Sequence, residues 1–439
     1  MNEAWALTWF PFIFLYSYKL IKEGSRGDSK NIIFLALSWF ALLTSHNLMV
    51  LAFGPVFFLW VLLLLFLEKE KGNTLQVIYR FFLSGVLAFG LAAFFTLPAV
   101  FENKFTHIES VLVGYYDYSA HFPDLKQLLF SRFWGYGPSV WETKDDGMSF
   151  QIGHFHWILS LLIAFWIIYR IFKNKKEKSL SADFYILIFS VVVGWISLFL
   201  AHPRSTFIWR TITVLRYLQF PWRLLVIPTF TFSLAIGFIP KLMSEFKYIS
   251  KLKTLVVVIL SLGLVVFNWS YFLPEHGRMG ALTDEEKFSD AAWDLQQTAG
   301  IYDYLPIFAK TAPKEARKVV AEFVDPASYE VLEGVGEIED SSYQTNRVAF
   351  TVIADNDSTV RIGVFQFPGW EVYLDGERTE QYVPEGEEWG RMWIDVPKGE
   401  HVVEVEFTNT GIRTFGDFLS LVTWLGLVGY VLIRGRNYK

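Results

Sequence analysis

The sequence has 439 residues, of which 53% are hydrophobic, and it includes 43 phenylalanines and 17 tryptophans. Its mean hydropathy of +0.32 is typical of a membrane protein and argues against a soluble or disordered chain. The net charge of −5, without a basic stripe, indicates no nucleic-acid partner, and the lack of cysteine excludes disulfides and thiolate metal sites.

Nine apolar segments predict membrane-spanning helices. All but one reach the length that crosses a bilayer, about 17–25 residues. The shorter one, at 31–45, is separated from the next only by the turn around His46 and Asn47, which predicts a helical hairpin. In chain order the segments cover 5–22, 31–45, 48–67, 77–99, 154–173, 183–201, 221–241, 254–272 and 415–433. The expected fold is a polytopic α-helical membrane protein, with a helix bundle over residues 1–272.

Clusters of lysine and arginine predict the orientation of these spans. They lie at 19–30, 69–80, 170–178, 241–253 and 434–439. Because such clusters stay in the cytoplasm, all fall on one side when the N-terminus is outside and the C-terminus is cytoplasmic. The odd number of spans agrees, so we expect a multi-pass protein of the cytoplasmic membrane. The outside then receives the turn at His46, the loops at 100–153 and 202–220, and a block at 273–414.

The first apolar run begins after Asn2 and Glu3 rather than after cations, and it lacks a small-residue cleavage site. No cleavable signal peptide is therefore expected. An outside N-terminus suits such an anchor, and a chain without its first segments would begin in the same way.

Polar residues at the ends of the predicted spans are candidates for substrate binding. His46 and Asn47 form the tip of the hairpin, and Glu102 follows the outer end of the segment at 77–99. Polar groups at the ends of membrane helices often serve function, although a short turn needs them too. The remaining histidines are scattered, and His154 and His156 face different sides of a helix, so no zinc site is expected.

The loop at 100–153 combines turn-forming glycines, aromatic residues and a pair of carboxylates. Its substrate-binding candidates are Trp134, Tyr136, Asp145, Asp146 and Gln151. Ionised carboxylates can serve as bases or metal ligands. Two adjacent aspartates are not a chelating spacing, however, and a solvated turn is the favoured explanation for them. We therefore predict no metal site and assign no divalent cation.

The segment at 202–223 carries four arginines and no acidic residue. The lipid-phosphate-binding candidates are Arg204, Arg210, Arg216 and Arg223, and Trp222 is a further substrate-binding candidate. Exported loops usually avoid such cations. The planar guanidinium suits phosphate oxygens, so cations without carboxylate partners indicate an anionic ligand such as a lipid phosphate. Ordinary snorkelling into the headgroups explains Arg204 and Arg210 equally. Pro221 is expected to break the helix before Arg223.

Residues 273–414 predict an extracytoplasmic α+β domain, followed by a last helix and a tail at 415–439. Residues 278–313 are polar and loosely helical. Beyond them Val348, Phe350 and Val352 alternate with smaller or polar residues, as do Val403, Val405 and Phe407. Hairpin turns are expected at Asp375–Gly376 and at 397–400. Short strands of this kind predict an antiparallel β-sandwich, which serves as a structural cap or binds carbohydrate through Trp370, Trp389 and Trp393.

Several short segments together resemble one family of bacterial membrane proteins. They are 134–137 (WGYG), 148–153 (MSFQIG), 218–223 (LQFPWR), 302–306 (YDYLP), 367–370 (FPGW), 372–376 (VYLDG) and 397–401 (PKGEH). As a set they resemble the 6-pyruvoyl-tetrahydropterin-synthase-related multi-span proteins, close to the YfhO-type family. The resemblance covers nearly the whole chain. Despite that name, the sequence has no zinc-binding histidine set of a soluble pterin enzyme.

Members of that family resemble the GT-C superfamily of glycosyltransferases, multi-span enzymes that take a sugar from a polyprenyl-phosphate carrier outside the membrane. The resemblance implies transfer to a cell-envelope glycan or polymer acceptor, with the carrier phosphate near Arg223 and Arg216. It also implies a catalytic acid in a first outer loop, and no such loop precedes Trp5 here. We therefore assign no catalytic residue, name no cofactor, and expect a chain that lacks its N-terminal part.

A non-enzymatic alternative is a lipid-linked sugar flippase or an envelope-assembly scaffold. It would use the same cations and the same exported domain without a carboxylate base. A flippase should place polar residues along the membrane midplane, and the segments at 183–201 and 254–272 carry few. That scarcity favours the enzyme.

Overall fold

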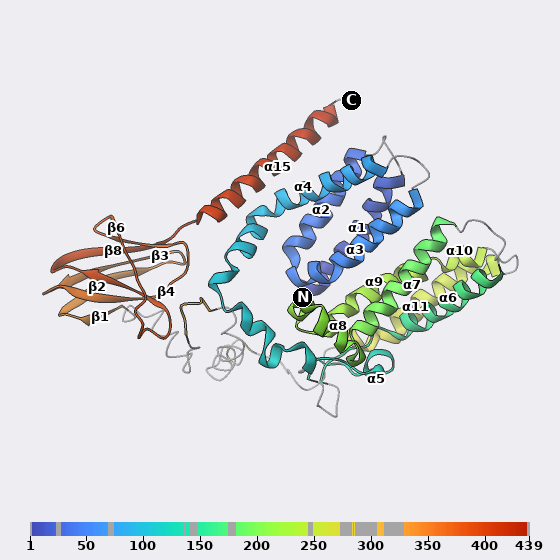
Figure 1. Cartoon of the computed structure of the whole chain (residues 1–439), viewed down its shortest axis with the longest axis horizontal. Helices are drawn as coiled ribbons and strands as arrows, with labels where there is room; N and C mark the ends of the chain where they lie inside the picture. The colour runs from blue at the N-terminus through green and yellow to red at the C-terminus, as the bar shows by residue number, and fades with distance from the viewer. Residues whose placement is uncertain are drawn as a thin grey trace. The chain divides into compact units, whose positions relative to one another are not determined.

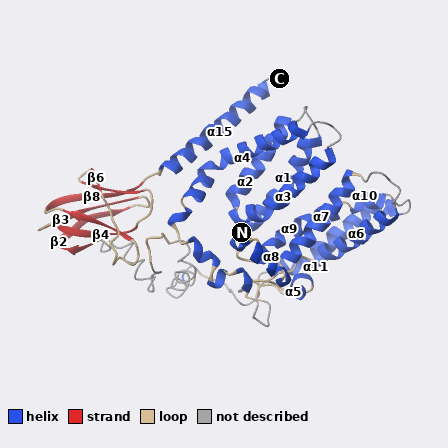
Figure 2. Ribbon diagram, viewed as in Figure 1, coloured by secondary structure: helices blue, strands red, loops and turns tan. Residues whose placement is uncertain are grey.

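The computed structural model describes residues 2–22, 28–68, 74–135, 137, 139–140, 147–173, 181–244, 249–272, 283, 285, 305–310 and 329–436. Helices fill most of the chain before residue 273, and strands lie between residues 330 and 407 (Figures 1 and 2). The chain divides into two compact units. The first comprises Met1–Ala92 and Leu112–Arg278, and the second comprises Ala93–Val111 and Met279–Lys439.

The long helices coincide with the apolar segments of the sequence. They are α1 (Asn2–Lys22), α2 (Asp28–Ser45), α3 (Asn47–Glu68), α4 (Thr74–Phe101), α6 (His154–Lys173), α7 (Ala182–Leu200), α9 (Val226–Ile236), α10 (Ile239–Ser244), α11 (Lys253–Asn268) and α15 (Gly411–Arg436). Seven stretches of the described residues are helical, long and apolar enough to cross a membrane, and α2 is a shorter apolar helix. The count of nine spans stays a prediction.

The core of the first unit forms where the apolar face of α1 meets α3. Phe10 stacks on Phe53 with ring centroids 3.8 Å apart, and Phe14 stacks on Trp60 at 4.4 Å. The four-residue step from Phe10 to Phe14 keeps both rings on one side of the helix. The indole of Trp60 donates to Oγ of Ser17 at 2.9 Å, which satisfies the polar group inside this apolar core.

Short helical turns join the long helices. Between α4 and α6 lie η3 (Asn103–Phe105), η4 (Ile108–Leu112), η5 (Gly114–Tyr116), η6 (Tyr118–Ala120) and α5 (Leu125–Leu129). Between α7 and α9 lie η7 (Pro203–Ser205), α8 (Thr206–Thr211), η8 (Thr213–Leu218) and η9 (Pro221–Leu225), and η10 (Ile249–Leu252) and η11 (Trp269–Phe272) flank α11. The helix break predicted at Pro221 is confirmed, because η8 ends at Leu218 and η9 begins at Pro221.

The second unit contains two antiparallel sheets. One has the order β1 (Glu330–Glu333), β4 (Ser358–Phe365), β7 (Arg391–Val396), and the other has the order β2 (Gly336–Tyr343), β3 (Arg347–Ala354), β8 (Gly399–Phe407), β5 (Trp370–Leu374), β6 (Glu377–Thr379). The predicted alternation is confirmed in β3, where Val348, Phe350 and Val352 are buried. They share one core with Ile362 of β4 and Ile394 of β7, so the sheets bury their apolar faces together.

The two predicted turns differ in outcome. Asp375 and Gly376 have φ of 52° and 81° and connect the paired strands β5 and β6, as predicted. Residues 397–398 connect β7 to β8, which belong to different sheets, so the prediction of a hairpin there is wrong. The turn residues were recognised, but they serve a crossing between sheets. The helix predicted at 278–313 lies almost entirely outside the described residues.

Candidate functional site

A group of polar contacts in the first unit surrounds Arg223, near the start of η9. We call Glu3, His46, Gln219, Trp222 and Arg223 the Arg223 cluster. It draws on three parts of the chain, namely the first turn of α1, the residue between α2 and α3, and the connection from η8 to η9. The sequence indicated three of its members, His46, Trp222 and Arg223.

Arg223 is held by hydrogen bonds to three groups. Its Nε donates to Oε1 of Glu3 at 2.6 Å, and its Nη1 donates to the carbonyl of Leu218 at 2.8 Å and to Oε1 of Gln219 at 2.6 Å. The guanidinium carbon lies 4.7 Å from the ring centroid of Phe220, and 12% of the side chain is exposed. Arginine carries five N–H donors. Among the described residues none accepts from Nη2, so its two donors remain available.

The backbone beside Arg223 is strained. Gln219 has φ of 62° and ψ of −50°, and the N–H of Phe220 donates to the carbonyl of Leu218 at 2.6 Å. This is a γ-turn with positive φ, a rare conformation for a residue with a side chain. Arg223 contacts both Leu218 and Gln219 and so helps to hold the turn. Strain of this kind persists where the surrounding structure enforces it, and it concentrates at functional sites.

Local sequence explains how the turn feeds into η9. Phe220 precedes proline and is extended, with φ of −117° and ψ of 111°. Pro221 then opens η9, where a missing N–H costs nothing. The rings of Phe220 and Trp222 stack with centroids 5.2 Å apart and an interplanar angle of 10°. The indole N–H of Trp222 is buried and finds no acceptor within the described ranges.

His46 lies beside the carboxylate of the cluster, with its Nε2 3.9 Å from Oε1 of Glu3. Burial lowers the pKa of the imidazole below its ordinary value; the Glu3 carboxylate acts against this shift, and the Arg223 guanidinium adds to it. The ring is therefore neutral at pH 7, and the contact with Glu3 is not an ion pair. Its Nδ1 is buried without a partner in the part of the chain that the structure describes.

The structure corrects one inference from the sequence. The segment at 202–223 was expected to lack carboxylate partners, yet Arg223 is paired with Glu3. The two residues lie 220 positions apart, so the acidic residue could not be found by inspecting the segment alone. One signal was present, because Glu3 is a carboxylate at the outer end of a predicted span.

Arg204, Arg210 and Arg216 differ from Arg223. All three side chains are exposed, and none forms an ion pair with a residue that the structure describes. Asn47 is exposed at the start of α3. Their side chains do not contribute to the hydrogen bonds of the Arg223 cluster, although the carbonyl of Arg216 accepts from the N–H of Gln219 at 2.9 Å.

The candidates from the loop at 100–153 are only partly described. The ring of Trp134 lies edge-on to Tyr271 at 6.3 Å, and the side-chain amide of Gln151 donates to the carbonyl of Ser131. The first contact ties the loop to η11, and the second lies within the loop itself. Tyr136, Asp145 and Asp146 lie outside the described residues.

Glu102 belongs to the second unit and is engaged there. Its Oε2 accepts from Nε and Nη2 of Arg413 at 2.9 and 2.7 Å, and its Oε1 accepts from the hydroxyl of Thr410 at 2.5 Å. The side chains of Glu102 and Arg413 are largely buried, with 9% and 14% exposed. A fully engaged carboxylate of this kind fixes the end of α4 to the start of α15 within the second unit.

The three tryptophans that suggested a carbohydrate surface are half-buried in the second unit. Trp370 packs on Phe407 with centroids 5.0 Å apart. The indole of Trp393 donates to the buried carboxylate of Glu387 at 3.2 Å, and the ring of Trp389 lies under the guanidinium of Arg391 at 4.5 Å. The partial cover of all three side chains limits the surface that they could offer to a carbohydrate.

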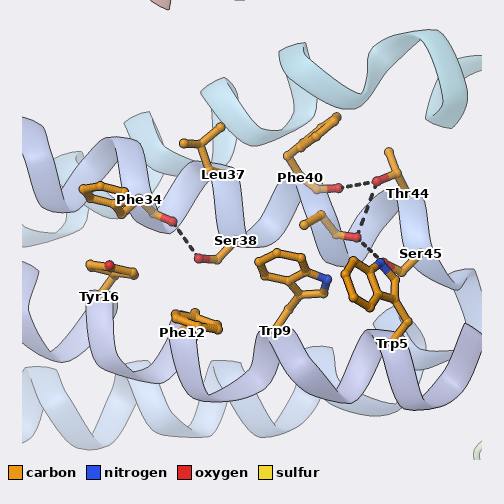
Figure 3. A pocket seen from close by; sticks show the side chains of 11 residues that line it. Trp5, Trp9, Phe12, Tyr16, Phe34, Leu37, Ser38, Phe40, Thr44 and Ser45 are labelled. Carbon is orange, nitrogen blue, oxygen red and sulfur yellow. Dashed lines mark hydrogen bonds between the residues drawn. The ribbon is translucent and has the colours of Figure 1, made fainter. Parts of the chain in front are cut away.

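An apolar groove of about 800 Å³ lies between α1 and α2. Figure 3 shows Trp5, Trp9, Phe12 and Tyr16 of α1 pointing toward α2. The hydroxyl of Ser38 on the α2 wall donates to the backbone of its own helix, so the wall is effectively apolar. Glu3 stands two residues before Trp5, a rotation of about 200°. The groove and the Arg223 cluster therefore lie on opposite faces of α1.

Among the described residues there is no group of three or more histidine, cysteine, aspartate or glutamate side chains that could hold a metal ion. The chain matches no protein-family model, no curated protein and no solved structure.

Proposed function

We propose that this chain binds a polyprenyl-phosphate-linked sugar at the Arg223 cluster and transfers the sugar to a cell-envelope acceptor, as a GT-C-like glycosyltransferase or a part of one. One observation carries the proposal. A mostly buried guanidinium beside a strained turn keeps both N–H groups of Nη2 without an acceptor among the described residues. Such a group suits phosphate oxygens, and the long apolar helices suit the hydrocarbon part of the carrier.

In the proposed reaction the acceptor hydroxyl oxygen attacks C1 of the sugar, and the bond between C1 and the phosphate oxygen breaks. The phosphate leaves with the electron pair, and Arg223 stabilises the negative charge that develops on it. The hydroxyl proton passes to a carboxylate, for which Glu3 is the candidate because it contacts Arg223. Its Oε2 has no hydrogen-bond partner within the described ranges and can accept that proton.

A non-enzymatic carrier-binding protein, either a lipid-linked sugar flippase or an assembly scaffold, is the second candidate. The ion pair between Glu3 and Arg223 supports it, since a carboxylate in that contact can position the arginine without taking part in a chemical step. The two candidates share the phosphate site and differ in whether Glu3 takes part in a chemical step.

Binding tests the shared part of both candidates. Polyprenyl phosphate is titrated into the full chain in lipid nanodiscs, with Arg223→Ala, Arg223→Lys and, as a matched control at the end of α6, Arg170→Ala. We expect Arg223→Ala to weaken the binding of polyprenyl phosphate about 10- to 100-fold, which corresponds to the free energy of a charged hydrogen bond. The affinity of Arg223→Lys should lie between those of the alanine variant and the wild type. Equal affinity of Arg223→Ala and Arg170→Ala would exclude Arg223 as the phosphate site.

The Glu3→Gln variant separates the two candidates. If Glu3 accepts the proton, this variant retains carrier binding and loses transfer, so that lipid-linked sugar accumulates on the outer leaflet of cells that carry it. If the chain is a flippase, deletion cells accumulate lipid-linked sugar on the inner leaflet instead. Transfer that survives in Glu3→Gln would remove Glu3 from the chemical step.

A further inference from the structure

The segment at 203–218, which we call the arginine segment, is fixed to the first unit along one face. Trp209 is fully buried, its indole donates to the carbonyl of Leu200 at 2.9 Å, and its ring stacks on Tyr118 at 5.1 Å with an interplanar angle of 9°. Leu218 is buried as well. This face therefore packs against the first unit through buried side chains.

The opposite face of the arginine segment mixes arginine with large apolar side chains. Five exposed side chains are spread along η7, α8 and η8, and we call them the exposed stripe: Arg204, Phe207, Arg210, Val214 and Tyr217. Phe207 is 63% exposed and Val214 is 47% exposed. Arg216 adds a third exposed cation beside Tyr217.

Neither water nor hydrocarbon alone suits this stripe. In water the apolar side chains lose the favourable free energy of burial, and at the centre of a bilayer each arginine charge is energetically unfavourable. At the bilayer surface both are satisfied, because apolar side chains enter the acyl region while guanidiniums reach the phosphates. The segment follows α7, which ends at Leu200, and precedes the apolar helical stretch that begins at Pro221. A short connection between two spans begins and ends at the same bilayer surface.

We infer that the arginine segment lies on the bilayer surface, inserts Phe207, Val214 and Tyr217 among the acyl chains, and binds the phosphates of anionic lipids through Arg204, Arg210 and Arg216. None of these three cations is neutralised by a carboxylate among the described residues, so their positive charge complements the negative charge of the lipid headgroups. The carrier site at Arg223 is separate, because that side chain is mostly buried and is held by Glu3 and Gln219, whereas these three arginines are exposed, so either conclusion can fail without the other.

The lack of native cysteine makes a direct test possible. Single cysteines replace Val214, Val258 in the middle of α11 and Asp357 in the second unit, and each is labelled with bimane in the full chain. The proteins are placed in bilayers that contain brominated phosphatidylcholine or brominated phosphatidylglycerol. Quenching by bromine on the acyl chains reports insertion, and the ratio between the two lipids reports local selectivity for the anionic headgroup.

We expect strong quenching at positions 214 and 258, little at 357, and a preference for phosphatidylglycerol at 214 alone. Replacing Arg204, Arg210 and Arg216 by glutamine should lower that preference about fivefold per arginine, which corresponds to about 1 kcal/mol for each cation near an anionic surface. Inorganic phosphate in solution should not compete. Quenching at 214 as low as at 357 would overturn the inference, and would point to water or another protein surface over the stripe.

Discussion

Arg413 donates two hydrogen bonds to one oxygen of Glu102, from Nε at 2.9 Å and from Nη2 at 2.7 Å, across 311 positions of sequence. The pair is largely buried, so removing one partner leaves a charge without compensation. We predict that Glu102→Ala lowers the free energy of unfolding by about 3–5 kcal/mol, and that the double change to Glu102→Leu and Arg413→Met restores most of it. Chemical unfolding followed by tryptophan fluorescence measures both.

The matched control for that pair is Arg347→Ala on β3. Its guanidinium contacts Glu404 and Glu406, but 45% of the side chain is exposed. The free energy of unfolding should therefore fall by less than about 1 kcal/mol. If Glu102→Ala cost no more than Arg347→Ala, the ion pair with Arg413 would not stabilise the second unit.

The γ-turn at Gln219 predicts an unusual order of stability between two substitutions. Gln219→Ala and Gln219→Gly both remove the side-chain acceptor of Arg223, so they differ only in backbone preference. Alanine normally favours folding over glycine by about 0.4–1 kcal/mol. At φ of 62° we expect the reverse, with the glycine variant more stable by about 1–2 kcal/mol. Comparison of the two unfolding free energies checks this, and the normal order would show that the turn relaxes.

Gly416 and Gly426 of α15 are predicted to respond to alanine with opposite signs. A Cβ at Gly416 would stand 2.8 Å from the carbonyl oxygen of Ala93, whereas one at Gly426 meets nothing within 4 Å. We expect Gly416→Ala to cost about 1–3 kcal/mol through overpacking. Gly426→Ala should leave the free energy of unfolding unchanged or raise it by up to about 1 kcal/mol, because alanine has the higher helix propensity. Equal effects, measured by thermal unfolding in nanodiscs, would mean that the α4 backbone does not approach Gly416 so closely.

Asp375 should make stability depend on pH in the acidic range. Hydrogen bonds from His401 and from the N–H of Val402 lower the pKa of its carboxyl. The stabilisation is therefore complete above the unfolded pKa, about 4, and is lost as pH falls through the lower folded value. Asp375→Asn keeps the turn, since asparagine tolerates positive φ. The difference in melting temperature between wild type and variant should narrow below pH 4; a constant difference down to pH 2.5 would contradict the assignment.

The pattern of apolar residues along the sequence predicted the helices and strands well, because neighbouring residues largely determine where these elements form. The apolar runs define the ends of the long helices to within a few residues, and the alternation at Val348, Phe350 and Val352 identified β3 with its buried face. What failed depends on distant partners. Glu3 reaches Arg223, and residues 397–398 lead into another sheet, and neither relationship leaves a periodic trace in the sequence. The sequence therefore located the candidate site through Arg223. The contribution of Glu3 and the strained turn at Gln219 became visible only in the structure.

The separation of Glu102 from Arg413 also constrains the order in which the protein is made. Ribosomes add about 5–20 residues per second, so 311 residues take roughly 15–60 s to synthesise. During that interval the carboxylate at the end of α4 exists without its arginine and without Thr410. The second unit can therefore close around this pair only when the start of α15 has left the ribosome, which makes its completion a late step in biogenesis.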